Sequence, residues 1–206
     1  MQVEYINGLG IYRAFHSGYQ RLLEKRDYLN KINFYPVPDG DTGTNLASTF
    51  SSIADSLKAE RSVNKVLGSM AEAVLEGARG NSGIIVAQFI SGLKRESEGM
   101  DKMHMRDFSQ AAERASRYTY AAVSDPVEGT ILTVIKDWAA ALNNLSARAA
   151  NVSELFREAL RYAEKSLEKT KTVLEENRRA GVEDAGASGF VAFLSGLNAF
   201  IVEGIR

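Results

Sequence analysis

The segment Asn33-Phe-Tyr-Pro-Val-Pro-Asp-Gly-Asp-Thr-Gly-Thr-Asn45 places two carboxylates, Asp39 and Asp41, on either side of a single glycine. Two of the chain's three prolines, Pro36 and Pro38, stiffen the approach to this pair. A Gly-Thr-Asn helix start follows, whose N–H groups are suited to anionic phosphate oxygens. Paired carboxylates on a rigid loop suit Mg²⁺, which prefers oxygen ligands at fixed positions and commonly bridges to substrate phosphates. The segment therefore predicts a magnesium–nucleotide site at the start of a helix.

Helical periodicity dominates the chain on both sides of this loop. Apolar residues at three- and four-residue spacings run from Tyr12 to Leu29, with Arg and Lys between them, and predict an amphipathic helix. Thr44 or Asp41 is the expected N-cap of the next helix. Further helices are predicted over residues 43–59, 62–77, 82–96, 106–123, 129–145, 152–180 and 188–205. The predicted fold class is all-α, a single domain over residues 1–206 with about eight helices and no alternating strand pattern.

Composition narrows the functional classes. A chain of 206 residues is long enough for one sizeable core. Its net charge of −1 argues against nonspecific nucleic-acid binding, which depends on a basic surface, so no nucleic-acid partner is expected. The absence of cysteine excludes disulfides and thiolate metal sites. The N-terminus lacks a signal-peptide pattern, and the longest apolar run, Gly83–Ile90, falls far below the roughly 20 residues that span a bilayer. We therefore expect a soluble cytoplasmic domain with no transmembrane segment.

We call the loop that carries Asp39 and Asp41 the acidic loop. Three further junctions between predicted helices resemble it, because each combines small residues with a hydroxyl or carboxylate side chain at a helix start. They are Gly77-Ala-Arg-Gly-Asn-Ser-Gly83, Asp125-Pro-Val-Glu-Gly-Thr130 and Gly181-Val-Glu-Asp-Ala-Gly-Ala-Ser-Gly189. Glycine lets the backbone approach a ligand, and the N–H groups that follow face it. Each junction alone is also typical of an ordinary C-cap followed by an N-cap. None is a P-loop or a GxGxxG after a strand, so a nucleotide site here would be built from helix N-termini.

Other site chemistries fit the sequence less well. An EF-hand calcium loop needs further acidic positions, and residues 42–52 contain no Asp or Glu. His16 and His104 are isolated and are interpreted as structural or solvated side chains. No nearby His or Lys suits Ser82 or Ser188 as a nucleophile, so a hydrolase triad is not expected.

Taken together, these motifs resemble the nucleotide-binding domain shared by dihydroxyacetone kinases and bacterial fatty acid kinases. The match to fatty acid kinases is closer, because their signature runs approximately Asn-x-Phe-Pro-Val-Pro-Asp-Gly-Asp-Thr-Gly-Thr-Asn, similar to residues 33–45. Residues 77–83, 126–133 and 180–186 are also similar, and the order along the chain is the same. The resemblance implies a barrel of eight antiparallel helices that binds ATP and Mg²⁺ at one end.

The resemblance also implies residue roles. Asp39 and Asp41 would be the catalytic residues and bind magnesium, two ions in all, against the phosphates of ATP or ADP. Dihydroxyacetone kinases carry a third aspartate where Phe34 stands here, so Asn33, a neighbouring carboxylate or water would complete the metal shell. Ala187 replaces a glycine of the last motif. The implied nucleotide-binding residues are Gly43, Thr44, Asn45, Asn81, Ser82, Gly83, Glu128, Gly129, Thr130, Asp184, Ala185 and Gly186.

The implied activity is transfer of the ATP γ-phosphoryl group to a fatty acid presented by a fatty-acid-binding carrier protein, giving an acyl phosphate for phospholipid synthesis. A carboxylate acceptor is already ionised at neutral pH, so the missing general base is consistent with it. The alternatives are the ATP-binding subunit of a dihydroxyacetone kinase and a non-catalytic module that binds nucleotide or lipid. Fatty acid kinases are much longer, so we expect an N-terminal domain or a stand-alone relative, with any homodimer formed through regions beyond this chain.

Overall fold

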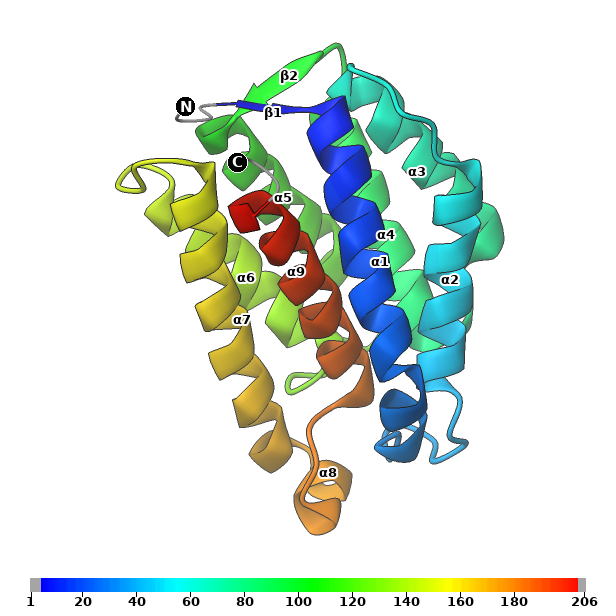
Figure 1. Cartoon of the computed structure of the whole chain (residues 1–206). Coiled ribbons are helices and arrows are strands. Elements are labelled where there is room, and N and C mark those ends of the chain that lie inside the picture. The colour runs from blue at the N-terminus through cyan, green and yellow to red at the C-terminus, as the bar shows by residue number, and fades with distance from the viewer. Residues whose placement is uncertain (1–4, 204–206) are drawn as a thin grey trace.

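The computed structural model describes residues 5–203, which form helices running up and down around a common core (Figure 1). Two short strands, β1 (Tyr5–Asn7) and β2 (Lys102–His104), lie at one end. The helices are α1 (Gly8–Lys31), α2 (Thr42–Ser56), α3 (Val63–Gly77), α4 (Gly80–Glu96), α5 (Met105–Ala122), α6 (Ile131–Leu145), α7 (Val152–Val173), α8 (Glu175–Ala180) and α9 (Ala185–Glu203).

The long helices form a closed ring. Each of α1 to α6 packs against the next, α7 packs against α9, and α9 returns to α1. Figure 1 shows α9 between α7 and α1. The prediction of an all-α fold is therefore confirmed, and α2, α4, α6 and α9 all begin at the same end of the ring because consecutive helices are antiparallel.

Two features differ from the helical prediction. β1 and β2 pair antiparallel, with Ile6 opposite Met103, so the expectation of no strand was wrong here. The helix expected over residues 152–180 is interrupted at Leu174, whose backbone is extended (φ −84°, ψ 137°) between α7 and α8. Leu174 is buried at this bend, so its apolar side chain is covered by the core without continuing the helix.

Aromatic side chains fill the centre of the ring. Phe50 lies with its ring centroid 5.8 Å from that of Phe15 and 4.7 Å from that of Phe193. A second group joins α4, α6, α7 and α9 and consists of Phe89, Trp138, Phe156 and Phe190. An apolar cavity of about 470 Å³ extends from these rings toward the end where α1 begins, between residues such as Leu9 and Ile201.

Helix α9 is long and apolar enough by composition to cross a membrane over Ala185–Val202. The sequence analysis, which considered only uninterrupted apolar runs, did not identify this stretch. In the structure 56% of it is buried, and the helix packs against α1, α6 and α7. Its apolar composition is therefore explained by this packing against neighbouring helices of the ring.

We expect close backbone approach between α1 and α9 to make Gly196→Ala destabilising. A Cβ at Gly196 would lie 2.4 Å from the backbone oxygen of Ser17, and one at Gly18 would lie 2.5 Å from the Phe193 ring. Overpacking of this kind costs about 1–3 kcal/mol of unfolding free energy. Gly68 in α3 is the matched control, because a Cβ there meets nothing within 4 Å and Gly68→Ala should stabilise by about 0.5–1 kcal/mol. Urea denaturation measures both, and equal effects would contradict the close approach.

Candidate functional site

The four predicted junctions meet at the end of the ring where α2, α4, α6 and α9 begin, and they line a polar pocket of about 640 Å³. A pocket of this size can hold a small-molecule ligand or cofactor. Of the residues expected to bind metal or nucleotide, the lining includes Asn33, Asp39, Asp41, Asn45, Asn81, Ser82, Thr130, Asp184 and Gly186. Lining residues to which the sequence analysis gave no metal or nucleotide role are Tyr35, Pro36, Val37, Thr42, Gly80, Ile84, Ile85, Ala122, Val123, Asp125, Val127, Ile131 and Leu132.

The acidic loop is held in place by Asn33, which is 5% exposed. Its amide Nδ2 donates to the backbone oxygen of Val37 at 2.9 Å, and its Oδ1 accepts from both the N–H and the hydroxyl of Thr42. Asp39 and Asp41 are exposed at the pocket, with Gly40 between them in the left-handed region (φ 69°). The role of Asn33 as a third metal ligand stays a prediction, and it would require Oδ1 to give up these donors.

Two residues expected to bind nucleotide hold the start of α2 against α1 in the structure, and their nucleotide contact stays a prediction. The backbone N–H of Thr44 donates to Asn30 Oδ1 at 3.0 Å, and Asn30 Nδ2 donates to Thr44 Oγ1 at 2.9 Å. A Cβ at Gly43 would lie 2.1 Å from the backbone oxygen of Arg26. Neither Gly43 nor Thr44 is among the lining residues of the described pocket. Asn30, which anchors them, carried no motif signal in the sequence.

The start of α4 is the best placed for an anionic ligand. Within the described chain its first turn has no side-chain cap, and Gly80, Asn81 and Ser82 all line the pocket. A Cβ at Gly80 would lie 2.7 Å from Asn45 Nδ2, so glycine allows α4 to begin directly beside α2. Gly83 faces Thr49 rather than the pocket. The N–H groups of this turn are therefore available to phosphate oxygens.

Asp184 joins the starts of α6 and α9. Its Oδ1 accepts the N–H of Ala187 at 2.8 Å, and its carboxylate also accepts the N–H of Ile131. Its own N–H donates to Thr170 Oγ1 of α7 at 3.0 Å. Burial raises the pKa of Asp184 to about 6, against the effect of the two N–H donors. Asp184 thus ties three helices together beneath the pocket, and its neighbour Ala185 is buried outside the lining.

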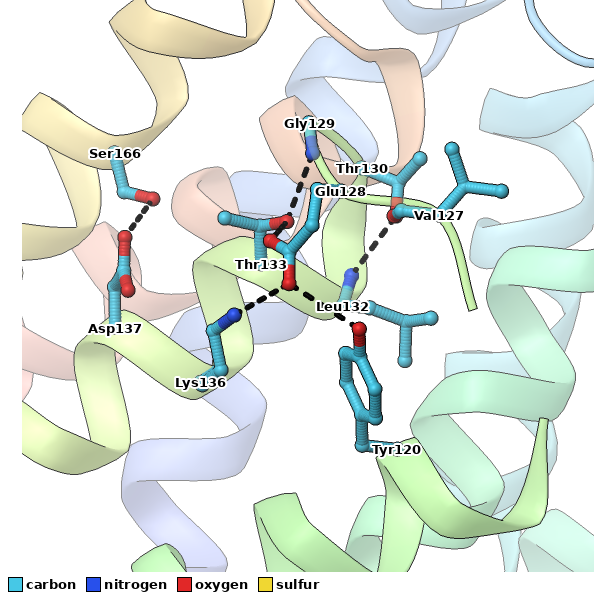
Figure 2. A network of polar contacts seen from close by, with 10 residues as sticks. All are labelled: Tyr120, Val127, Glu128, Gly129, Thr130, Leu132, Thr133, Lys136, Asp137 and Ser166. Atoms are coloured by element: carbon cyan, nitrogen blue, oxygen red, sulfur yellow. Dashed lines mark hydrogen bonds and ion pairs between the residues drawn. The ribbon is translucent and has the colours of Figure 1, made fainter. Parts of the chain in front are cut away.

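The third junction divides its residues between the pocket and a separate polar network (Figure 2). Thr130 lines the pocket and caps α6, accepting the N–H of Leu132 at 3.3 Å and donating to the backbone oxygen of Val127 at 2.8 Å. Figure 2 shows the carboxylate of Glu128 directed to Lys136, Thr133 and Tyr120 instead. Glu128 and Gly129 do not line the described pocket.

The pocket is acidic. Among the described residues that line it, none is Lys or Arg, whereas Asp39, Asp41, Asp125 and Asp184 all contribute carboxyl groups. The pKa of Tyr35 is raised, first by burial and then by the negative charges of Glu176, Asp125 and Asp184. No group of three or more His, Asp or Glu side chains that could hold a metal ion occurs in the described residues, and the acidic loop contributes two carboxylates, Asp39 and Asp41, to the pocket lining. This donor set suits Mg²⁺, which binds one or two carboxylates and completes its shell with water and phosphate.

Comparison with known families identifies this architecture. The family profile described as "DAK2 domain" matches residues 36–199. The chain belongs to the DAK2 domain family. An uncharacterized protein of Mycoplasma pneumoniae is 34% identical over 195 residues, covering 90% of this chain and 35% of the relative. Protein YloV of Bacillus subtilis is 32% identical over 198 residues, covering 95% and 36%. This DAK2 domain chain thus spans about a third of the length of these relatives.

Solved structures agree on the fold. The dihydroxyacetone kinase of C. freundii in complex with AMP-PNP and Mg²⁺ superposes with a TM-score of 0.68 at 17% identity, covering 91% of this chain and 33% of that chain. The native form of that kinase gives a TM-score of 0.67 at 17% identity, covering 96% and 35%. At this level of identity the likeness establishes the shared helical barrel.

The raised pKa of Asp184 predicts a pH-dependent stability difference between the wild type and Asp184→Asn. Its pKa is 3.8 when unperturbed and about 6 in the fold, so the stability that this group contributes is full below about pH 4 and is lost as pH rises through 6. The asparagine side chain of the variant cannot titrate, so the variant should gain about 2–3 kcal/mol relative to the wild type between pH 4 and pH 7. Urea unfolding across this range tests the prediction, with exposed Asp101→Asn as the control. A constant difference for Asp184→Asn would contradict the raised pKa.

Proposed function

We propose that this DAK2 domain is the magnesium–ATP-binding domain of a phosphotransferase. The single observation that carries the proposal is the convergence of the uncapped start of α4 and the Asp39/Asp41 pair on one pocket. Amide donors and metal-binding carboxylates are complementary requirements for holding a triphosphate. The match to the DAK2 family and the likeness to a kinase solved with AMP-PNP and Mg²⁺ support the same function.

The charge of the pocket supports a metal complex as the ligand. A nucleotide triphosphate brings several negative charges toward Asp39, Asp41, Asp125 and Asp184, and no Lys or Arg in the described lining offsets them. Mg²⁺, bound by Asp39 and Asp41, would supply that neutralisation in phosphoryl transfer. We propose two ions, as the family resemblance implies, with Asn33, a nearby carboxylate or water completing the ligands. Asn45, Asn81 and Ser82 would orient the nucleotide.

The proposed acceptor is a fatty acid presented by a separate carrier protein. Its carboxylate is ionised at neutral pH and needs no base. A dihydroxyacetone kinase subunit is the alternative within the same chemistry, and its hydroxyl acceptor would have to lose a proton. Asp125 is the candidate base in that case, because Asp184 is engaged by two N–H groups and Asp39 and Asp41 are assigned to metal.

The remaining parts of the proposal concern the whole protein. We propose that residues 1–206 form one DAK2-type domain of a cytoplasmic kinase. Because the chain spans about a third of its relatives, we assign any homodimer contacts to regions outside it, whereas the separate carrier protein holds the acceptor.

A lipid-binding module without catalysis is the second candidate. The observation in its favour is the cavity of about 470 Å³, whose lining is largely aliphatic and aromatic and which opens away from the polar pocket. Apolar ligands bind in such concave, hydrophobic sites. This function does not require Asp39 or Asp41.

Asp39→Asn and Asp41→Asn should each weaken magnesium-dependent ATP binding. Each change removes one negative charge from the donor pair, and losses at metal sites cost about 10–100-fold even for supporting residues. Both side chains are exposed, so the free energy of unfolding should be almost unchanged. Calorimetric titration with ATP in the presence and absence of Mg²⁺ measures the effect, with Asp101→Asn at the opposite end as control. Undiminished magnesium-dependent ATP binding in both variants would contradict the assignment of Asp39 and Asp41 as magnesium ligands.

The acceptor is tested by incubating the chain with Mg-ATP, a fatty acid and its carrier protein, and assaying acyl phosphate. Acyl phosphate should form, and Asp125→Asn should leave its rate within a few-fold because a carboxylate acceptor needs no base. If dihydroxyacetone with its binding subunit is phosphorylated instead, Asp125→Asn should lower that rate by about 10²–10⁴-fold. ATP binding without turnover with either acceptor would favour the binding module.

A further inference from the structure

The loop between α5 and α6 shapes one wall of the polar pocket without being part of a helix. Val123, Asp125, Val127 and Thr130 from residues 123–130 line the pocket. Loops of this kind are mobile unless their backbone and side chains are tied down. The bonds that fix this loop therefore determine whether the wall is formed before a ligand arrives.

Glu128 makes those bonds from the side of the loop that faces away from the pocket. Its Oε1 accepts from Lys136 Nζ at 2.6 Å and from the Tyr120 hydroxyl at 3.2 Å, and its Oε2 accepts from the Thr133 hydroxyl at 2.6 Å. Tyr120 belongs to α5, whereas Thr133 and Lys136 belong to α6. One carboxylate therefore connects the loop to both flanking helices (Figure 2).

The neighbouring residue completes the attachment. The N–H of Gly129 donates to Thr133 Oγ1 at 2.8 Å, so Thr133 is bonded to two consecutive loop residues. Gly129 has a φ of 84°, and a Cβ there would lie 2.6 Å from the side chain of Val173 at the end of α7. The loop thus turns sharply and packs against a third helix.

This network stabilises the global fold only weakly. The Glu128 and Lys136 side chains are 49% and 46% exposed, and ion pairs at such exposed positions contribute little to the free energy of unfolding. The hydrogen bonds from Lys136 and then Thr133 lower the pKa of Glu128, so the carboxylate is ionised at neutral pH. The energy of the network is concentrated on a short loop, where it changes the population of one loop conformation more than it changes the unfolding equilibrium.

We propose that Glu128 is a positioning residue that pre-forms the nucleotide pocket by clamping residues 123–130 to α5 and α6, without contacting the nucleotide. The proposal rests on the proposed function and assigns Glu128 a different role from the direct nucleotide contact implied by the family resemblance. Lys136 and Tyr120 act through Glu128, and Thr133 acts through both Glu128 and Gly129. Their effect on the ligand is transmitted by Val127 and Thr130, which line the pocket on either side of the clamp.

The test is calorimetric titration of the purified chain with Mg-AMP-PNP. Glu128→Ala should raise the Kd about 10-fold, the penalty when only a tenth of the molecules hold the competent loop. Lys136→Gln should weaken binding in the same direction although it lies outside the pocket lining. The double variant Glu128→Ala/Lys136→Gln should bind no more weakly than Glu128→Ala, because both changes release one clamp. Glu158→Ala, which breaks an exposed Glu–Arg pair on α7, is the matched control and should leave the Kd unchanged.

Hydrogen exchange of the nucleotide-free chain provides an independent readout. Backbone amides of residues 124–130 should exchange faster in Glu128→Ala, while urea unfolding stays close to that of the wild type. A loss of affinity in Glu128→Ala with unchanged exchange and a neutral Lys136→Gln would indicate direct nucleotide contact and overturn the proposal. Full affinity in Glu128→Ala would overturn it as well. If the wild type itself binds no Mg-AMP-PNP, the proposed function is contradicted, and with it the proposal that Glu128 pre-forms a nucleotide pocket.

Discussion

Helix α9 packs against α1 at Gly18 and Gly196, where the backbones come too close for a larger side chain, and this contact joins the last helix of the chain to the first. Ring closure has a geometric consequence for function. Because antiparallel neighbours alternate in direction around a closed ring, the starts of α2, α4, α6 and α9 are brought to one end. The four sequence motifs precede these four helices, so the ring is what converts separated motifs into one pocket.

The residues of the motifs fall into two groups in the folded chain. Some face the pocket, as Asp39, Asn81 and Thr130 do. Others fix the geometry of the first group: Thr44 binds Asn30 of α1, and Glu128 binds side chains of α5 and α6. Each motif therefore contains residues that line the pocket together with residues that hold the surrounding helices in place, and the motif itself does not say which residue does which.

Helical periodicity predicted the long helices because each presents a stripe of apolar side chains to one core, a pattern written locally in the sequence. Helical periodicity did not predict the bend at Leu174 or the pairing of Ile6 with Met103, because both depend on segments that are distant in the sequence. The sequence motif included Asp184, but it did not predict that the Asp184 carboxyl group caps both α6 and α9. Side-chain direction is a tertiary property, and residue type alone does not determine it.

The charge of the polar pocket constrains its chemistry further. Two of its four carboxyl groups, Asp39 and Asp41, lie on an exposed loop, whereas Asp184 is buried and already bonded to backbone N–H groups. On the proposed function, a phosphate-bearing ligand would meet free amides at α4 and acidic side chains at the acidic loop. These two surfaces are compatible with one anionic ligand only when a cation lies between the ligand and the carboxylates. On the proposed function, the same residues that would repel a bare nucleotide would select its magnesium complex, and the acidic loop would have a specificity role in addition to the proposed catalytic one.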